Sequence, residues 1–167
     1  MNKIKFKRFN IETKQISDVP ENYKLNDING YSIYDYLQYL GFEDANGNEL
    51  YQGDIIELHI TKDLMKSSFC CSNLGKYCGN HPEVTDILLI FDNSNILTMQ
   101  YKVAQKINGN LDYDEEGDGD LNIITYGEDS NFPQYLISKG AIYIGNILEM
   151  ESILTKDFEN KESEYDR

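Results

Sequence analysis

The feature that most constrains the fold is the segment 38–57, in which turn-forming residues separate two apolar runs. The pair Asn46-Gly47 lies between the runs, and both residue types tolerate the positive φ that tight hairpin turns require. A second pair, Gly53-Asp54, lets the backbone bend again just before an alternating strand. This turn chemistry predicts a β-hairpin in a β-rich domain and by itself says nothing about function.

Short apolar segments that are alternating or rich in β-branched residues recur along the chain and favour strands. We expect residues 36–42 and 49–60 to pair as an antiparallel hairpin, with residues 141–148 in the same sheet or barrel. Further strands are expected at 3–9, 87–91, 96–103 and 123–126, a loop at 17–30, a strand or a helix at 31–39, and a short helix at 129–139 with Pro133 in its first turn. The expected fold is mostly β, or α+β: a small barrel or strongly curved antiparallel sheet with one or two short helices.

Three sequence blocks follow one another in the order found in a known family. The central block, 38–55, reads QYLGFEDANGNELYQGDI; the opening block, 4–10, reads IKFKRFN; and the closing block, 142–149, reads IYIGNILE. Together they resemble YopX-like proteins, which are encoded mainly by phages and prophages of Gram-positive bacteria. The resemblance implies that the three blocks are strands that close the fold together. It brings no established chemistry that can be assigned to residues.

A chain of 167 residues suits one domain. We expect a single β-rich domain over residues 1–155, with an insertion at about 62–82, an acidic loop at about 108–122, and a charged tail over 156–167. No apolar run approaches the roughly 20 residues of a membrane-spanning helix, and the N-terminus lacks the features of a signal peptide. Three cysteines, an odd number, argue against a secreted disulfide framework. Given the phage resemblance, the expected location is the host cytoplasm.

Charge is the second strong feature of the sequence, because 29 acidic and 15 basic residues give a formal charge of −14. A surface this negative repels phosphate backbones, so we expect no direct nucleic-acid binding and instead an encounter with a basic surface on a host protein. The expected partner-binding residues are carboxylates in and after the acidic loop: Asp112, Asp114, Glu115, Glu116, Asp118, Asp120, Glu128 and Asp129. The simpler interpretation, that an acidic pI keeps the protein soluble, stays open.

The expected insertion contains residues that can ligate zinc. Cys70, Cys71, Cys78 and His81 are close in sequence, and His59 lies one strand away. Thiolates and imidazoles are the ligands of tetrahedral zinc sites. However, the chain has no Cys-x-x-Cys pair, and adjacent cysteines rarely ligate one metal together. Ordinary loop cysteines are therefore the preferred interpretation, with zinc, a disulfide or a reactive thiol as alternatives.

The acidic loop also resembles a calcium-binding sequence. The run that begins at Asp114 matches an EF-hand loop through its ninth position, with Gly119 at the sixth. Its twelfth position is Thr125 in place of the bidentate Glu, and no strong amphipathic helices flank it. A solvated loop or a partner-docking loop is preferred over calcium binding. We therefore expect no metal site and no cofactor.

The sequence contains no motif that indicates catalysis. It lacks a Walker loop, a dinucleotide fingerprint and an HExxH motif, and no recognised nucleophile supports either histidine. We expect a non-catalytic phage accessory protein that binds and modulates a host protein. In its most concrete form it is an acidic inhibitor that mimics nucleic acid in a nucleic-acid-handling or anti-phage defence complex. The alternatives are a metal-binding or enzymatic module that uses the Cys/His insertion, and a homo-oligomeric structural protein with a Tyr-rich surface.

Overall fold

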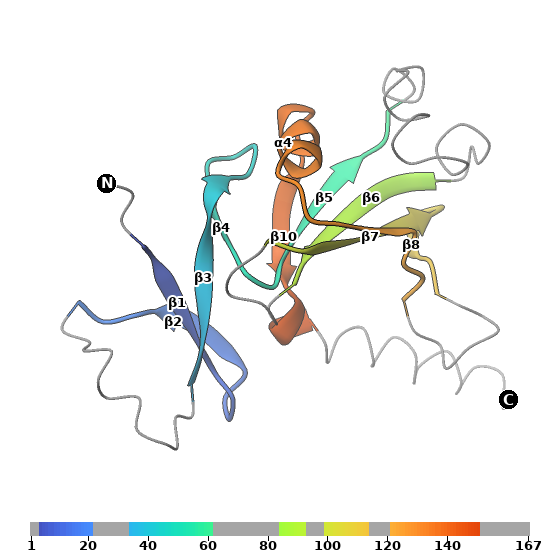
Figure 1. The fold of residues 1–167 in the computed structure, drawn as a ribbon. Helices are drawn as coiled ribbons and strands as arrows, with labels where there is room; N and C mark the ends of the chain where they lie inside the picture. Colours follow the sequence, from blue (N-terminus) through green and yellow to red (C-terminus); the bar gives the residue numbers. More distant parts are fainter. Residues whose placement is uncertain (1–3, 22–33, 62–83, 93–98, 114–120, 151–167) are drawn as a thin grey trace, which may run out of the picture.

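A computed structural model describes residues 4–21, 34–61, 84–92, 99–113 and 121–150 (Figure 1). The expected insertion at 62–82 and the expected charged tail at 156–167 lie outside these residues. Within the described ranges, no helix has the length and apolar character needed to cross a membrane.

The strands form two curled antiparallel sheets that lie beside each other (Figure 1). The first has the order β2-β1-β3-β4, with β1 (Phe6–Asn10), β2 (Gln15–Asp18), β3 (Tyr34–Glu43) and β4 (Glu49–Tyr51). The second has the order β10-β5-β6-β7-β8, and β9 also pairs with β7; its strands are β5 (Asp54–His59), β6 (Val84–Phe91), β7 (Tyr101–Ile107), β8 (Asn110–Leu111), β9 (Thr125–Gly127) and β10 (Ile142–Asn146). The described helices are α4 (Asn131–Ser138) and one turn at residues 147–150. The prediction of a mostly β fold with strongly curved strands and one or two short helices is confirmed.

Both faces of the six-stranded sheet are buried near its middle. Successive residues of a strand point to opposite faces. On one face, Ile56 of β5 and Leu89 of β6 pack with Leu136 of α4. On the other face, Ile55 and Leu88 belong to a second apolar cluster. This double burial explains why β6 reads as a nearly continuous apolar run.

The hairpin expected between residues 36–42 and 49–60 forms only in part: the prediction is correct for residues 49–51 and wrong for residues 54–59. Residues 49–51 form β4, which pairs with β3 through Tyr39 and Tyr51. The chain then turns at Gly53, whose φ is 81°, and residues 54–59 enter the other sheet as β5. β10 pairs with β5, so it shares a sheet with the second half of the expected hairpin and not with β3.

Two further strand predictions need correction. β2 occupies part of the expected loop at 17–30, because Ile16 packs against the buried Phe9 of the neighbouring strand. β7 spans Tyr101–Ile107, whereas the expected strand spanned 96–103. Its partner β6 spans Val84–Phe91 and is longer than the expected 87–91, because it pairs with β7 along its whole length. The helix prediction at 129–139 is confirmed by α4.

Asp44 organises the loop between β3 and β4. One carboxylate oxygen accepts the backbone N–H groups of Asn46 at 2.9 Å and Asn48 at 2.8 Å. The other oxygen accepts the N–H of Tyr143, in β10, at 2.7 Å. Only Gly47 of the expected turn pair has a positive φ, 84°. The loop is therefore shaped by a side chain that also fastens it to the second sheet.

Candidate functional site

Most of the carboxylates expected to bind a partner lie outside the described residues: Asp114, Glu115, Glu116, Asp118 and Asp120. The expected calcium loop falls mainly in the same segment. Of the other three, Asp112 contacts Gln105 towards one end of β7, and Glu128 contacts Gln100 just before its other end. The structure therefore does not bring the described carboxylates into one cluster.

Asp112 closes the base of the acidic loop. Its carboxylate accepts hydrogen bonds from Gln105 Nε2 at 3.0 Å and Asn122 Nδ2 at 3.2 Å. A bridge between Tyr113 and Leu121 lies next to it. The half-buried Asp112 thus bonds to residues on both sides of the loop.

Asp129 begins α4. One carboxylate oxygen accepts the N–H groups of Asn131 at 2.9 Å and Phe132 at 3.0 Å, and the other accepts the Tyr101 hydroxyl at 3.3 Å. The hydrogen bond from the Phe132 N–H is the main reason why the pKa of Asp129 is lowered. A negative side chain at the start of a helix is stabilising. Asp129 therefore also has a structural role, although it is exposed, as its neighbour Glu128 is.

Glu128 lines a groove of about 540 Å³ at the pairing of β7 with β9. Lys102 and Tyr126 lie directly opposite each other across this pair, and so project from the same face. Gln100 donates to the Glu128 carboxylate at 3.2 Å, and Asp92 lines the groove where β6 ends. We refer to these residues, with Tyr101 and Gly127, as the β7–β9 groove.

The β7–β9 groove has an aromatic surface and a backbone floor. Tyr126 is 70% exposed. A side chain at Gly127 would overlap the ring of the buried Tyr101, so only glycine fits over that ring. The sequence analysis did not select Tyr126 or Asp92. No signal in the sequence identified them, because the groove exists only once two strands separated by the acidic loop have paired.

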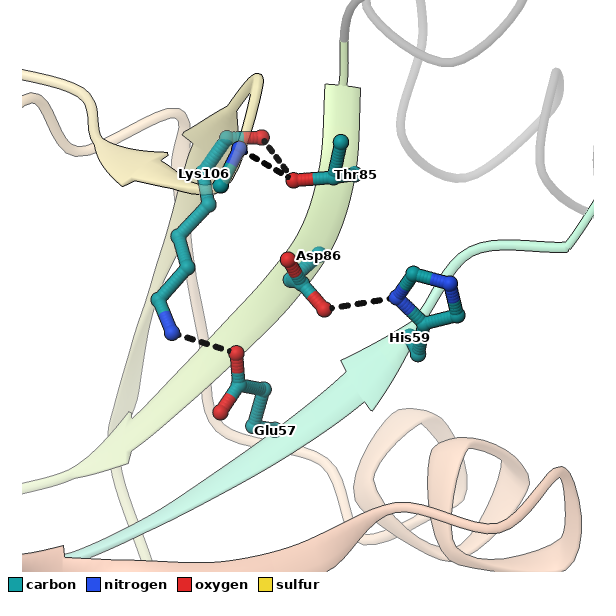
Figure 2. Close-up of polar contacts among 6 residues, drawn as sticks. Glu57, His59, Thr85, Asp86 and Lys106 are labelled. Atoms are coloured by element: carbon teal, nitrogen blue, oxygen red, sulfur yellow. Dashed lines mark hydrogen bonds and ion pairs between the residues drawn. The ribbon is translucent and has the colours of Figure 1, made fainter.

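A row of charged side chains crosses β5, β6 and β7 at the far end of the same face (Figure 2). Asp86 lies opposite both His59 and Lys106, and its carboxylate contacts His59 Nδ1 at 3.0 Å. The Lys106 ammonium instead reaches Glu57, at 2.6 Å (Figure 2). Thr85 fixes the adjoining turn by accepting the N–H of Gly109 at 2.9 Å. The row thus pairs Asp86 with His59 and Glu57 with Lys106.

His59 is the one residue of the alternative zinc site that the structure describes. Its side chain is 72% exposed, and the second ring nitrogen points away from Asp86 (Figure 2). No group of three or more Cys, His, Asp or Glu residues suited to a metal occurs in the described part of the chain. The remaining expected ligands lie outside it: Cys70, Cys71, Cys78 and His81.

A buried polar joint connects the two sheets where β4 passes into β5. Asn146 of β10 donates to the Gln52 carbonyl at 3.0 Å and to the Asp54 carboxylate at 2.8 Å. Asp54 also accepts the Tyr51 N–H at 2.7 Å. The Gln52 side chain in turn accepts the N–H of Gln38, in β3, at 3.0 Å. Most of these residues belong to the blocks that carry the family resemblance, so those blocks serve the fold.

Asp54 is an ionisable group in a nearly dry environment. Burial raises its pKa to about 6, although the hydrogen bonds from Asn146 and Tyr51 and the charge of Lys7 act in the opposite direction. The nearby Glu149 raises the pKa further. Asp54 is the buried titratable group most sensitive to pH in the joint.

Comparison with known proteins identifies one matching protein family. Residues 1–155 match the protein family described as YopX protein. No match was found among curated proteins. The matched range includes all the described strands and the buried joint.

We predict that Gly53→Ala destabilises the protein by about 2 kcal/mol or more, because alanine is strained at positive φ and its Cβ would lie 2.9 Å from the Asn146 side chain. Gly109→Ala is the matched control. Gly109 has a φ of 80°, and a Cβ there meets nothing within 4 Å. Urea unfolding of both variants checks the prediction. Equal losses of stability would show that the contact with Asn146 contributes nothing.

The raised pKa of Asp54 predicts a pH-dependent contribution to stability. An unfolded aspartate titrates near pH 3.9, so the folded state holds the proton more tightly. The contribution is therefore fully present below pH about 4 and is lost as the pH rises through 6. The free energy of unfolding of the wild type, minus that of Asp54→Asn, should fall by about 2 kcal/mol between pH 4 and 7. Chemical unfolding across this range measures the difference, and a flat difference would contradict the raised pKa.

Proposed function

The chain belongs to the YopX protein family, and within it we propose a non-catalytic function: the protein binds a partner protein through the partner's basic surface. In the most specific form of the proposal, it acts in the cytoplasm of a bacterial host. There it inhibits a nucleic-acid-handling or anti-phage defence complex by occupying a groove that normally holds phosphates. The resemblance to phage-encoded proteins supports this setting.

The observation that carries the proposal is that the positive side chains already have partners within the chain. Nearly every described cation is held against an aromatic ring or a carboxylate of the chain itself. Arg8 lies over the Tyr34 ring at 4.5 Å and Lys7 over the Tyr51 ring at 4.7 Å. The same holds for Lys5 with Tyr39 and Glu49, Lys14 with Phe9, Lys106 with Glu57, and Lys139 with Tyr135.

This arrangement favours a basic partner over nucleic acid. Cations that already contact the chain's own rings and carboxylates are less available to phosphate oxygens, and the whole chain carries a formal charge of −14. An uncompensated negative field attracts a positively charged surface and accelerates encounter with it. The negative electrostatic field favours all partners that have a basic surface. The residues at the contact then determine which of these partners binds.

The proposal predicts how partner binding depends on salt and on the acidic loop. The tagged protein is used to capture partners from a lysate of a Gram-positive bacterium, and the captured protein is then measured by surface plasmon resonance. Affinity should fall steeply as salt rises from 50 to 300 mM, since surface attraction is screened over about 10 Å at 0.1 M. The triple variant Asp114→Asn, Glu116→Gln, Asp118→Asn should slow association more than it speeds dissociation.

A second triple variant controls for total charge. Glu12→Gln, Asp18→Asn and Glu21→Gln remove the same number of charges near β1 and β2. This variant should lower the association rate less than the loop variant does. Binding that is indifferent to salt, or unchanged in the loop variant, would contradict electrostatic docking through the loop.

One observation favours a second candidate function, metal binding. Asp86 orients His59 through Nδ1 at 3.0 Å, as carboxylates do for many zinc-bound histidines. These two residues lie towards the ends of β5 and β6 that flank the Cys/His segment in the sequence. Elemental analysis of the purified protein tests this candidate. Stoichiometric zinc that is lost in His59→Ala would support it, and a metal-free protein would exclude it.

A further inference from the structure

We propose that the helical turn at residues 147–150 is a clasp between the two sheets, and that ionisation of the buried Asp54 loosens it. The turn directly follows β10, a strand of the second sheet (Figure 1). Its side chains nevertheless contact the first sheet, so the turn holds the two sheets together. A rise in pH therefore opens this part of the molecule locally and leaves the rest folded.

Two residues of the turn reach the first sheet. Leu148 packs against the buried cluster that contains Phe9 and Tyr51. The Glu149 carboxylate accepts the N–H of Ile16, in β2, at 3.1 Å. In the described part of the chain β2 is an edge strand, so Glu149 supplies an acceptor that no neighbouring strand provides. The clasp therefore consists of an apolar contact and a hydrogen bond at a sheet edge.

Asp54 is bonded to both sides of the joint beside this turn. Its carboxylate accepts the N–H of Tyr51, in β4, at 2.7 Å and the Asn146 amide, at the end of β10, at 2.8 Å. The Asn146 oxygen in turn accepts the N–H of Leu148 at 3.0 Å. Asp54 is thus connected to the turn through one intervening side chain, and a change in its charge acts at the base of the clasp.

The groups around Asp54 come from four elements. Lys7 of β1 and Glu149 of the turn act on it through their charges, Tyr51 of β4 donates its N–H, and Tyr143 of β10 is close enough to respond to its charge. Burial raises the pKa of both tyrosine hydroxyls, so they stay neutral near pH 7. Burial also raises the pKa of Asp54 to about 6, Lys7 opposes this rise, and Glu149 adds to it.

Opening the clasp relieves two unfavourable effects on ionised Asp54. Movement of the turn lets water reach the carboxylate and increases its distance from Glu149. The open form therefore holds the Asp54 proton less tightly than the closed form. The resulting stabilisation of the closed form is fully present below pH about 4, the ordinary range of aspartate, and is lost as the pH rises through 6.

Hydrogen exchange of the full-length protein, measured by NMR, tests the clasp. The Ile16 and Leu148 amides report its opening, because Glu149 and Asn146 are their acceptors. Protection factors already correct for the intrinsic pH dependence of exchange. We expect those of Ile16 and Leu148 to be lower than those of the buried β6 amides, and to fall about tenfold from pH 5 to 7.5.

Conservative variants assign the fall to the two carboxylates. Asp54→Asn removes the titrating group, so protection at Ile16 and Leu148 should not change between pH 5 and 7.5. Glu149→Gln keeps an acceptor for the Ile16 N–H and removes the like charge, so the fall should shrink to about threefold, equivalent to half a pKa unit. Glu12→Gln, which removes an exposed carboxylate of the β1–β2 turn, should keep the full fall.

Three results would overturn the proposal. Protection at Ile16 and Leu148 that is independent of pH in the wild type would show that Asp54 does not act on the turn. Protection equal to that of the β6 amides would show that the turn opens only when the whole protein unfolds. A full tenfold fall in Glu149→Gln would show that repulsion between the carboxylates has no part. If Asp54→Asn does not fold, the wild type and Glu149→Gln still decide between these outcomes.

Discussion

The architecture depends on one buried asparagine. Asn146 is fully buried, and its amide N–H groups contact the Gln52 carbonyl and the Asp54 carboxylate, while its oxygen accepts the N–H of Leu148 at 3.0 Å. The segment 52–54 is where the chain passes from one sheet to the other. A side chain with a donor and an acceptor at the right separation is needed there, because an unpaired polar group in a dry interior costs about 1–3 kcal/mol. The relative position of the two sheets is thus fixed by hydrogen bonds of defined direction as well as by apolar contact.

This joint explains why the family resemblance informs the fold more than the activity. The residues that make the central and closing blocks recognisable, Gly53, Asp54 and Asn146, contact one another inside the protein. Gly53 lies so close to Asn146 that a side chain would collide with it. Residues of this kind are constrained by packing whatever the protein binds. The partner binding proposed above therefore has to use residues outside this buried joint.

Much of the fold was predictable because local chemistry and tertiary structure agree there. The apolar run of β6, the strand pattern around β1, and the helix with Pro133 in its first turn all carry signals within a few residues. The expected hairpin failed at β5 because alternation within a strand does not specify which neighbour the strand will pair with. Gly53 was recognised as a bend, but the size of the bend depends on Asn146, more than ninety residues further along the chain.

The candidate site was harder to predict for the same reason. Composition drew attention to carboxylates near β8 and α4, yet it could not show that Asp112, Glu128 and Asp129 each accept hydrogen bonds from the chain itself. Those bonds come from partners such as Gln105 and Gln100, which become neighbours only in the folded chain. The β7–β9 groove combines residues in and beside β7 and β9 with Asp92, which follows β6, so no single sequence window contains it.

The loop at Asp44 affects whether one molecule can add a strand to the sheet of another. β10 is an edge strand, and an edge with unpaired N–H and C=O groups is a template on which another chain can add a strand. Here the Asp44 carboxylate accepts the N–H of Tyr143, and the Ala141 carbonyl accepts the N–H of Ala45 at 3.0 Å. The loop between β3 and β4 thus bonds to the start of the β10 edge, where a strand of another molecule would otherwise pair. The fold closes this route to sheet growth with a turn, so the protein is protected at this edge against aggregation with other copies of itself.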